Sequence, residues 1–181
     1  MSVEHEVTSA SLLMLEYGSV KDEQRARIGF RDNLLYATIA STGAVVVGAL
    51  RSGNHAATLL LLPPVSVVLG WTYLVNDEKI SAIGRYVRAE IGPRLSALSA
   101  DQAPVLGWEL AHRADSGRRS RKFLQLGVDL LAFCLAPVAA LVAYWIADPS
   151  GGLLIATSAV EAVAVAVLGA QTVLYADLKG N

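Results

Sequence analysis

Residues 57–75, ATLLLLPPVSVVLGWTYLV, are nineteen consecutive positions without a charged side chain. A helix needs about 20 mostly apolar residues to cross a hydrocarbon core of about 30 Å. A surface helix of a soluble bundle instead carries a polar stripe that repeats every 3.6 residues, and this stretch has none. The stretch therefore predicts a membrane-spanning helix.

Three further runs share this character, at residues 33–50, 123–147 and 152–176, with lengths of 18, 25 and 25 residues. The chain is 54% hydrophobic and only 17% charged, which is more apolar than an ordinary soluble domain. We therefore predict an all-α membrane protein with four transmembrane helices.

The basic residues predict how the four helices are oriented. Of the 15 Lys and Arg residues, four lie in residues 1–32, nine in 76–122 and one in 177–181. Because basic residues are retained on the cytoplasmic side, we expect both termini and the middle segment inside, joined by transmembrane hairpins at 33–75 and 123–176. The acidic N-terminus lacks the basic start of a signal peptide, so we expect it in the cytoplasm of a cell-membrane protein.

Two acids, Asp129 and Glu161, lie inside apolar runs. At 1.5 Å per residue, Asp129 would lie about 9 Å from the inner end and Glu161 about 14 Å from the outer end, so we expect no direct carboxylate pair. Gln171 and Thr172 are the expected hydrogen-bond partners of Asp129. Intramembrane acids are functional candidates by default. The four residues predict either a polar track for protons or cations, or a structural anchor in which Asp129 reaches the neighbouring bases.

Those bases form a cluster at the entrance of the third run. Its members are Arg118, Arg119, Arg121 and Lys122. Such a cluster attracts anionic lipid headgroups, and it also sets topology without any further role. Both interpretations remain open.

The middle segment predicts an amphipathic helix that begins at Asn76, a good N-cap. One face would hold Ile80, Ile83, Val87 and Ile91. Gly92-Pro93 would end or kink this helix. The helix would lie on the lipid surface, cover the base of the helix bundle or pack against residues 1–32, which can continue as a helix into the first span.

Small residues at four-residue spacing predict close helix approach. They are Ala37, Ala40, Ser41, Ala44 and Gly48 in the first run, Ala132, Ala136 and Ala140 in the third, and Ala162, Ala166 and Ala170 in the fourth. We expect packing within the chain, with oligomerisation as the alternative. Pro63 and Pro64 should kink the second helix.

Aromatic residues stand near the ends of three runs. They are Trp71, Tyr73, Tyr144, Trp145 and Tyr175. Aromatic side chains gather at membrane interfaces, so we expect these positions to mark them.

The stretches RARIGFRDNLLYATIA (25–40) and LGWTYLVNDEKISAIGRYVRAEIGPRL (69–95) resemble functionally uncharacterised, small multi-pass integral membrane proteins of actinobacterial type. The resemblance implies a four-span topology and no catalytic residues. Metalloprotease, CxxC, Walker, GxSxG and Rossmann patterns are absent from the sequence. The single cysteine, Cys134, is expected to be a small apolar side chain.

We therefore expect a non-enzymatic, oligomeric membrane module that acts as a sensor, anchor or membrane-perturbing effector. The alternative is a subunit of a small ion channel or proton/cation-coupled transporter that uses Glu161 and Asp129. No cofactor or metal is predicted. The expected partners are the lipid bilayer, including anionic lipids, a second copy of the chain and a cytoplasmic protein. A formal net charge of -1 gives no electrostatic preference for nucleic acid.

Overall fold

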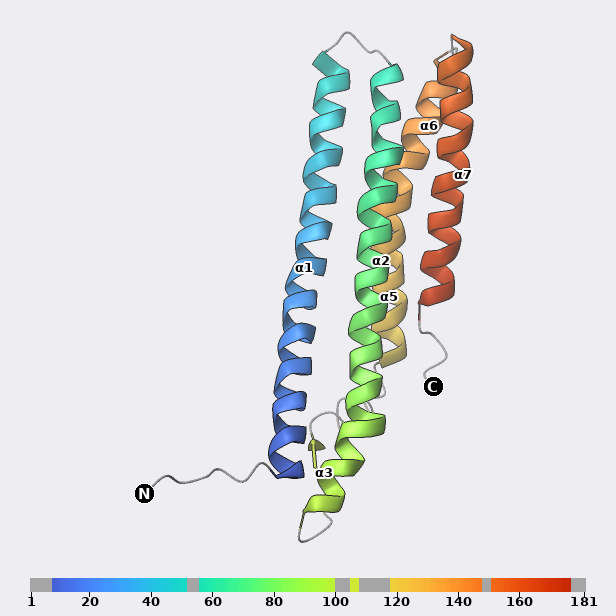
Figure 1. Cartoon of the computed structure of the whole chain (residues 1–181). Helices are drawn as coiled ribbons and strands as arrows, with labels where there is room; N and C mark the ends of the chain where they lie inside the picture. Colours follow the sequence, from blue (N-terminus) through green and yellow to red (C-terminus); the bar gives the residue numbers. More distant parts are fainter. Residues whose placement is uncertain (1–7, 52–55, 100–104, 108–117, 148–150, 177–181) are drawn as a thin grey trace. The chain divides into compact units, whose positions relative to one another are not determined.

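A computed structural model describes residues 8–51, 56–99, 105–107, 118–147 and 151–176, and these residues form helices and no strand (Figure 1). The elements are α1 (Ser9–Arg51), the 3-10 helix η1 (Ala56–Leu61), α2 (Leu62–Tyr86), the π-helix η2 (Val87–Ile91), α3 (Gly92–Leu98), α5 (Arg118–Leu130), the π-helix η3 (Leu131–Leu135), α6 (Ala136–Ile146) and α7 (Gly152–Tyr175).

Several elements follow one another without a break and form longer helical stretches. Four of these are long and apolar enough to cross a membrane. They are Ser9–Arg51, Ala56–Leu98, Ser120–Ile146 and Gly152–Tyr175. This confirms the predicted all-helical class with four candidate spans.

The chain divides into two compact units. Unit 1 comprises residues 1–30 and 77–116, and unit 2 comprises residues 31–76 and 117–181. Helices α1 and α2 each contribute to both units. In α1 the boundary between the units lies near the beginning of the first apolar run, and in α2 it lies near the end of the second apolar run.

Prolines mark changes of helix type. Pro63 and Pro64 lie in the first turn of α2, directly after η1, where a missing N–H costs no helical hydrogen bond. The helix also continues past Gly92-Pro93 instead of ending there, because the π-helix η2 precedes it. Pro137 repeats this arrangement after η3. A π turn is wider than an α turn, which makes room for the proline ring.

The core of unit 2 lies where α2, η3 and α7 meet. A cluster of buried apolar residues contains Leu34, Tyr73, Phe133 and Leu168. The Tyr73 and Phe133 ring centroids are 4.9 Å apart. A second cluster, Leu60, Leu141 and Tyr144, joins η1 to α6. Since residue 60 pairs with 141–144 and residue 73 with 133, α2 runs antiparallel to η3 and α6.

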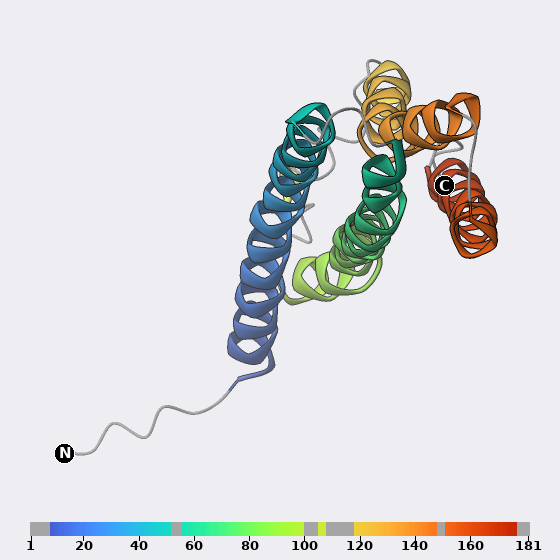
Figure 2. The same ribbon diagram turned by 90° about the horizontal axis from the view of Figure 1, so that it is seen from above.

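Gly70 is a point of close helix approach in unit 2. A Cβ added there would lie 2.8 Å from Cδ2 of Leu168 and 3.2 Å from Cβ of Phe133. Only glycine permits this distance. Figure 2 views the helices from above, and α5, η3 and α6 all contact α7.

Unit 1 pairs the beginning of α1 with the end of α2. The Gln24 side chain donates a hydrogen bond of 3.2 Å from Nε2 to the main-chain oxygen of Ile80. Val87 and Ile91 are buried, and Ile80 and Ile83 are half-buried. Of the placements expected for this amphipathic segment, the Gln24–Ile80 hydrogen bond supports packing against the N-terminal helix.

The expectation that the small-residue rows of α1 and α7 pack within the chain is wrong. Ala162, Ala166 and Ala170 are exposed, as are Ala37, Ala40, Ala44 and Gly48, whereas Ser41 is half-buried. These helices pack instead through larger or polar residues, such as Thr38 of α1 and Leu168 of α7, which are each 1% exposed. Packing within the chain holds only for the third row, where Ala140 is buried and Ala132 and Ala136 are half-buried.

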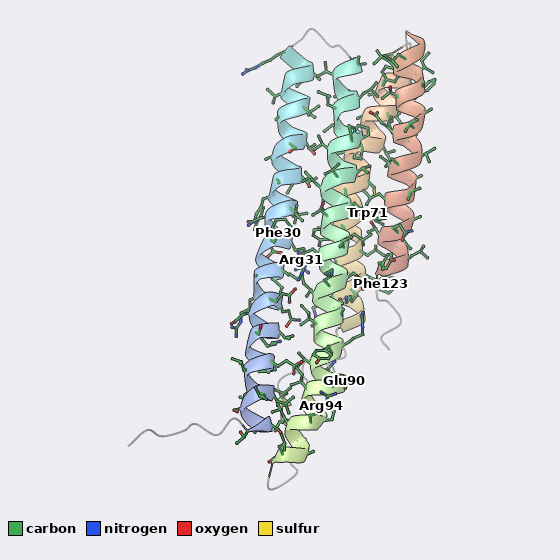
Figure 3. All side chains as sticks on the ribbon, in the orientation of Figure 1. Phe30, Arg31, Trp71, Glu90, Arg94 and Phe123 are labelled. Atoms are coloured by element: carbon green, nitrogen blue, oxygen red, sulfur yellow. The ribbon has the colours of Figure 1, made fainter. Side chains whose placement is uncertain are left out.

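The five aromatic residues also divide into two groups. Trp71, Trp145 and Tyr175 are exposed, whereas Tyr73 and Tyr144 are buried in the helix packing. Figure 3 labels Trp71 on α2. The exposed three remain the better markers of a membrane interface.

Candidate functional site

Asp129 lies in α5, two residues before η3, and its side chain is buried. Phe133 follows it by one helical turn. Phe133 and Leu168 both approach Gly70, so they lie at one level of unit 2. Thr172 lies one turn beyond Leu168 on the antiparallel α7. By helix rise from these contacts, Asp129 and Thr172 lie at one level; a hydrogen bond between them stays a prediction.

Thr172 contributes less to Asp129 than expected. Its hydroxyl Oγ1 donates to the main-chain oxygen of Leu168 at 2.9 Å, so its proton is used within α7. The hydroxyl oxygen can still accept a hydrogen bond. Gln171, the neighbouring candidate, is half-buried.

Glu161 lies on the packed side of α7 and is half-buried. Its Oε2 is buried and has no hydrogen-bond partner among the described residues. Ser158, one turn earlier, is fully buried, but its hydroxyl donates to the Ile155 main-chain oxygen at 2.9 Å. Thr157 is exposed and donates to Leu153 in the same way. Neither hydroxyl proton is therefore directed to the carboxyl group.

The two acids occupy different levels of unit 2. Glu161 precedes Leu168 by seven residues, about 10 Å, and Asp129 precedes Phe133 by about 6 Å in the opposite direction along the bundle. The carboxyl groups are thus separated by about 16 Å along the helix axes. The expectation of no direct carboxylate pair agrees with this register.

The basic cluster is described only in part. Arg121 is exposed and Lys122 is half-buried in α5. The side chains of Arg118 and Arg119 lie outside the described residues. Phe123, labelled in Figure 3, follows the cluster on α5 and is exposed.

Two further polar residues of unit 2 were not predicted to be site residues, although Tyr144 was expected to mark a membrane interface. Ser66 of α2 and Tyr144 of α6 are 1% and 3% exposed. Neither the Ser66 Oγ nor the Tyr144 hydroxyl has a hydrogen-bond partner among the described residues. Isolated Ser and Tyr residues in apolar runs are common, so the sequence holds no signal that distinguishes these two.

Arg31 contributes a charge at the other end of the unit 2 core. Its guanidinium carbon lies 6.0 Å from the centroid of the Tyr73 ring, within cation–π range. It also pairs with Asp32 at 3.4 Å. Figure 3 labels Arg31 on α1. This contact lies on the opposite side of Gly70 from Glu161.

The described residues of unit 1 form hydrogen bonds and ion pairs. Tyr86 donates a hydrogen bond of 2.5 Å from its hydroxyl to Oε1 of Glu16, and this bond raises the pKa of Tyr86. Glu90 and Arg94 pair at 3.2 Å (Figure 3). Among the described residues of both units, no group of three or more His, Cys, Asp or Glu side chains could hold a metal ion.

Comparison of the chain with protein-family models, with curated proteins and with solved structures finds no match.

Proposed function

We propose that the chain is a non-enzymatic integral membrane protein of the cell membrane. In this proposal both termini are cytoplasmic, and the protein acts as an oligomeric anchor that holds unit 1 at the inner membrane surface. Its partners would be the bilayer, a second copy of the chain and a cytoplasmic protein. The lipid-headgroup role of the basic cluster belongs to this proposal.

The observation that carries the proposal is the continuity of α1. This helix extends from Ser9 to Arg51 without a break, and therefore joins the polar part of unit 1 to an apolar run. At 1.5 Å per residue it is about 64 Å long, about twice the hydrocarbon thickness. A helix of this length can span the bilayer and extend beyond it, which suits an anchor or a sensor.

Accessibility labelling of introduced cysteines tests the topology. In a Cys134→Ser background, Ser19→Cys reports on unit 1 and Ser52→Cys on the link after α1. A membrane-impermeant maleimide should label position 52 in intact cells and position 19 only after permeabilisation. The reverse pattern, or labelling of both from outside, would contradict the proposed orientation.

The exposed small-residue rows of α1 and α7 support the oligomeric part of the proposal, because such rows permit close approach of a second helix. The test is the stoichiometry of labelled protein in lipid nanodiscs or vesicles. The double variant Ala44→Leu/Ala166→Leu should lower the oligomeric fraction. Val160→Leu is the matched control, because Val160 is 70% exposed and lies on α7 away from the row. Equal stoichiometry of the double variant and wild type would reject these rows as an interface.

A second candidate is a subunit of a small channel or transporter that uses Glu161 and Asp129. The observation that favours it is the buried Oε2 of Glu161, which lacks a donor among the described residues. Ion flux into liposomes tests it. Flux that is present in wild type and lost in Glu161→Gln/Asp129→Asn supports this candidate, and the absence of flux in wild type leaves the anchor.

A further inference from the structure

Three buried oxygen atoms on the Glu161 side of Gly70 in unit 2 have no hydrogen-bond partner among the described residues. They are the Oγ of Ser66, the hydroxyl of Tyr144 and the Oε2 of Glu161. A buried polar group without a partner costs about 1–3 kcal/mol, and in native proteins such groups are usually satisfied by ordered water. Three such groups in one small bundle therefore require an explanation.

The register of the helices brings these groups to the same part of unit 2. Gly70, Phe133 and Leu168 define one level, because a Cβ at residue 70 would contact both other side chains. Ser66 lies one turn, about 6 Å, from this level, and Glu161 lies about 10 Å from it in the same direction, toward the end where α6 finishes and α7 begins.

The main chain of Tyr144 lies farther along the same direction, eleven residues after Phe133. Side chains in a helix lean toward its N-terminus, so the Tyr144 ring leans back toward the level of Glu161. The ring packs with Leu60 and Leu141, which places it between α6 and the η1–α2 helix. The three side chains thus lie on one side of Gly70, at helix positions about 6, 10 and 16 Å from it, and the lean of the Tyr144 ring brings its hydroxyl toward Glu161. This part of unit 2 is referred to as the layer.

A water molecule needs two to four polar partners. A hydroxyl, a phenol and a carboxyl oxygen satisfy that need.

The charges near Glu161 determine whether its carboxyl group is protonated. None of the apolar runs 33–50, 57–75, 123–147 and 152–176 contains Lys, Arg or His. Arg31 contacts Tyr73 on the opposite side of Gly70. An ionised carboxylate without a counter-charge is too costly in this apolar surrounding, so a buried acid takes up a proton instead.

Other titratable groups on neighbouring elements are few. Among the described residues, the elements packed against α7 contribute Arg121, Lys122 and Asp129 of α5, Cys134 of η3, Tyr144 of α6 and Tyr73 of the unit 2 part of α2. The two bases and Asp129 lie on the Thr172 side of Gly70. Within the layer itself, Tyr144 is the titratable neighbour of Glu161.

We propose that unit 2 contains a hydrated proton-binding site in which Glu161 is protonated at neutral pH and is joined through ordered water to Ser66 and Tyr144. The ligand is a proton together with the water that solvates it. This inference deepens the second candidate function, since it names the chemistry of the Glu161 site. It also holds for an anchor that carries no ion.

Infrared spectroscopy of the full chain in lipid nanodiscs at neutral pH tests the proposal. Wild type should show a protonated carboxylic acid C=O band that is lost in Glu161→Gln and retained in Asp129→Asn. Transfer to D2O should shift the band rapidly, because water reaches the group. Loss of the band in Asp129→Asn instead, or its absence from wild type, would overturn the assignment of the proton to Glu161.

The water-mediated links have their own test. The variants Ser66→Ala and Tyr144→Phe remove one hydroxyl each and should move the band to higher frequency, because the acid is then hydrogen-bonded less strongly. Thr157→Ala is the matched control, since Thr157 is exposed on α7. A band that does not move in the first two variants, or that sodium or potassium ions abolish, would overturn the hydrated proton site. Liposome flux is measured separately, so a protein with the band and without flux supports this site while it rejects the transporter.

Discussion

Gly70 allows a close helix contact in unit 2, and one added methyl group tests that contact. In Gly70→Ala the new Cβ would lie 2.8 Å from Cδ2 of Leu168 and 3.1 Å from Cδ1 of Phe133. The end of the Leu168 side chain could rotate, but Cβ of Phe133, at 3.2 Å, is fixed to the main chain. Both residues are almost fully buried, so α2 itself must move.

Overpacking of this kind costs about 1–3 kcal/mol. We expect Gly70→Ala to lower the free energy of unfolding by that amount in an equilibrium titration with sodium dodecyl sulfate, followed by circular dichroism. Alanine favours a helix over glycine by about 1 kcal/mol in water. Because the detergent-unfolded state keeps much of its helix, this gain largely cancels, and the steric cost remains.

A matched control and a double variant make this test specific. In Gly169→Ala the new Cβ would lie 3.6 Å from Sγ of Cys134, an ordinary contact, so stability should change by less than about 0.5 kcal/mol. Leu168→Ala alone should cost about 2–5 kcal/mol, and the Gly70→Ala methyl should then partly fill the cavity. If Gly70→Ala costs as much with Leu168→Ala as without it, or no more than Gly169→Ala, the packing argument is refuted.

Three further predictions concern the two cores. Phe133→Ala should lower the free energy of unfolding of unit 2 by about 3–5 kcal/mol, measured in the same titration, because it removes the ring that packs against Tyr73. A decrease no larger than that caused by substitution of an exposed residue would contradict the packing. Gln24→Ala should lower the stability of unit 1 by about 0.5–1.5 kcal/mol. Amide hydrogen exchange should become faster in the part of α1 that belongs to unit 1 and should not change in unit 2. The hydrogen bond to Glu16 raises the pKa of Tyr86, so its stabilisation is complete below the unfolded pKa of about 10 and is lost as pH rises through the raised folded value. Tyr86→Phe should remove that alkaline step from the pH profile of unit 1 exchange, and an unchanged profile would show that the bond does not contribute.

The comparison of sequence with structure separates what composition predicts from what packing decides. Run length and hydropathy predicted four helices that could cross a membrane, because the requirement is set by helix rise and bilayer thickness alone. The 3.6-residue period predicted the packed face that contains Val87 and Ile91. The shared level of Asp129 and Thr172 rests on residue counting along two neighbouring helices, and their hydrogen bond stays a prediction.

The packing faces of the spans were not predictable in the same way. Small rows such as Ala162, Ala166 and Ala170 have the spacing of a helix contact, yet they are exposed. In an apolar run every face is hydrophobic, so periodicity does not identify the packed side. Gly70 is a single glycine without a partner at four-residue spacing, and only the approach of Phe133 and Leu168 reveals its importance.

The candidate site was predictable in part. Glu161 and Asp129 are conspicuous because acids are rare in apolar runs. Ser66 and Tyr144 were not predicted as site residues, because their significance depends on the lack of hydrogen-bond partners around their hydroxyl groups. That is a property of three-dimensional packing. The same applies to the hydroxyls of Thr172 and Ser158, whose protons the structure assigns to main-chain oxygens of their own helix.

By itself, the sequence determined that this protein is helical and contains four segments able to span a membrane, because the one-dimensional order of apolar and charged residues is enough to meet the length rule. Only the tertiary structure decided which sides of those helices pack, how π turns accommodate Pro93 and Pro137, and which buried oxygen atoms lack a partner. These features depend on contacts between residues far apart in the chain, and a uniformly apolar segment encodes such contacts through shape and not through polarity.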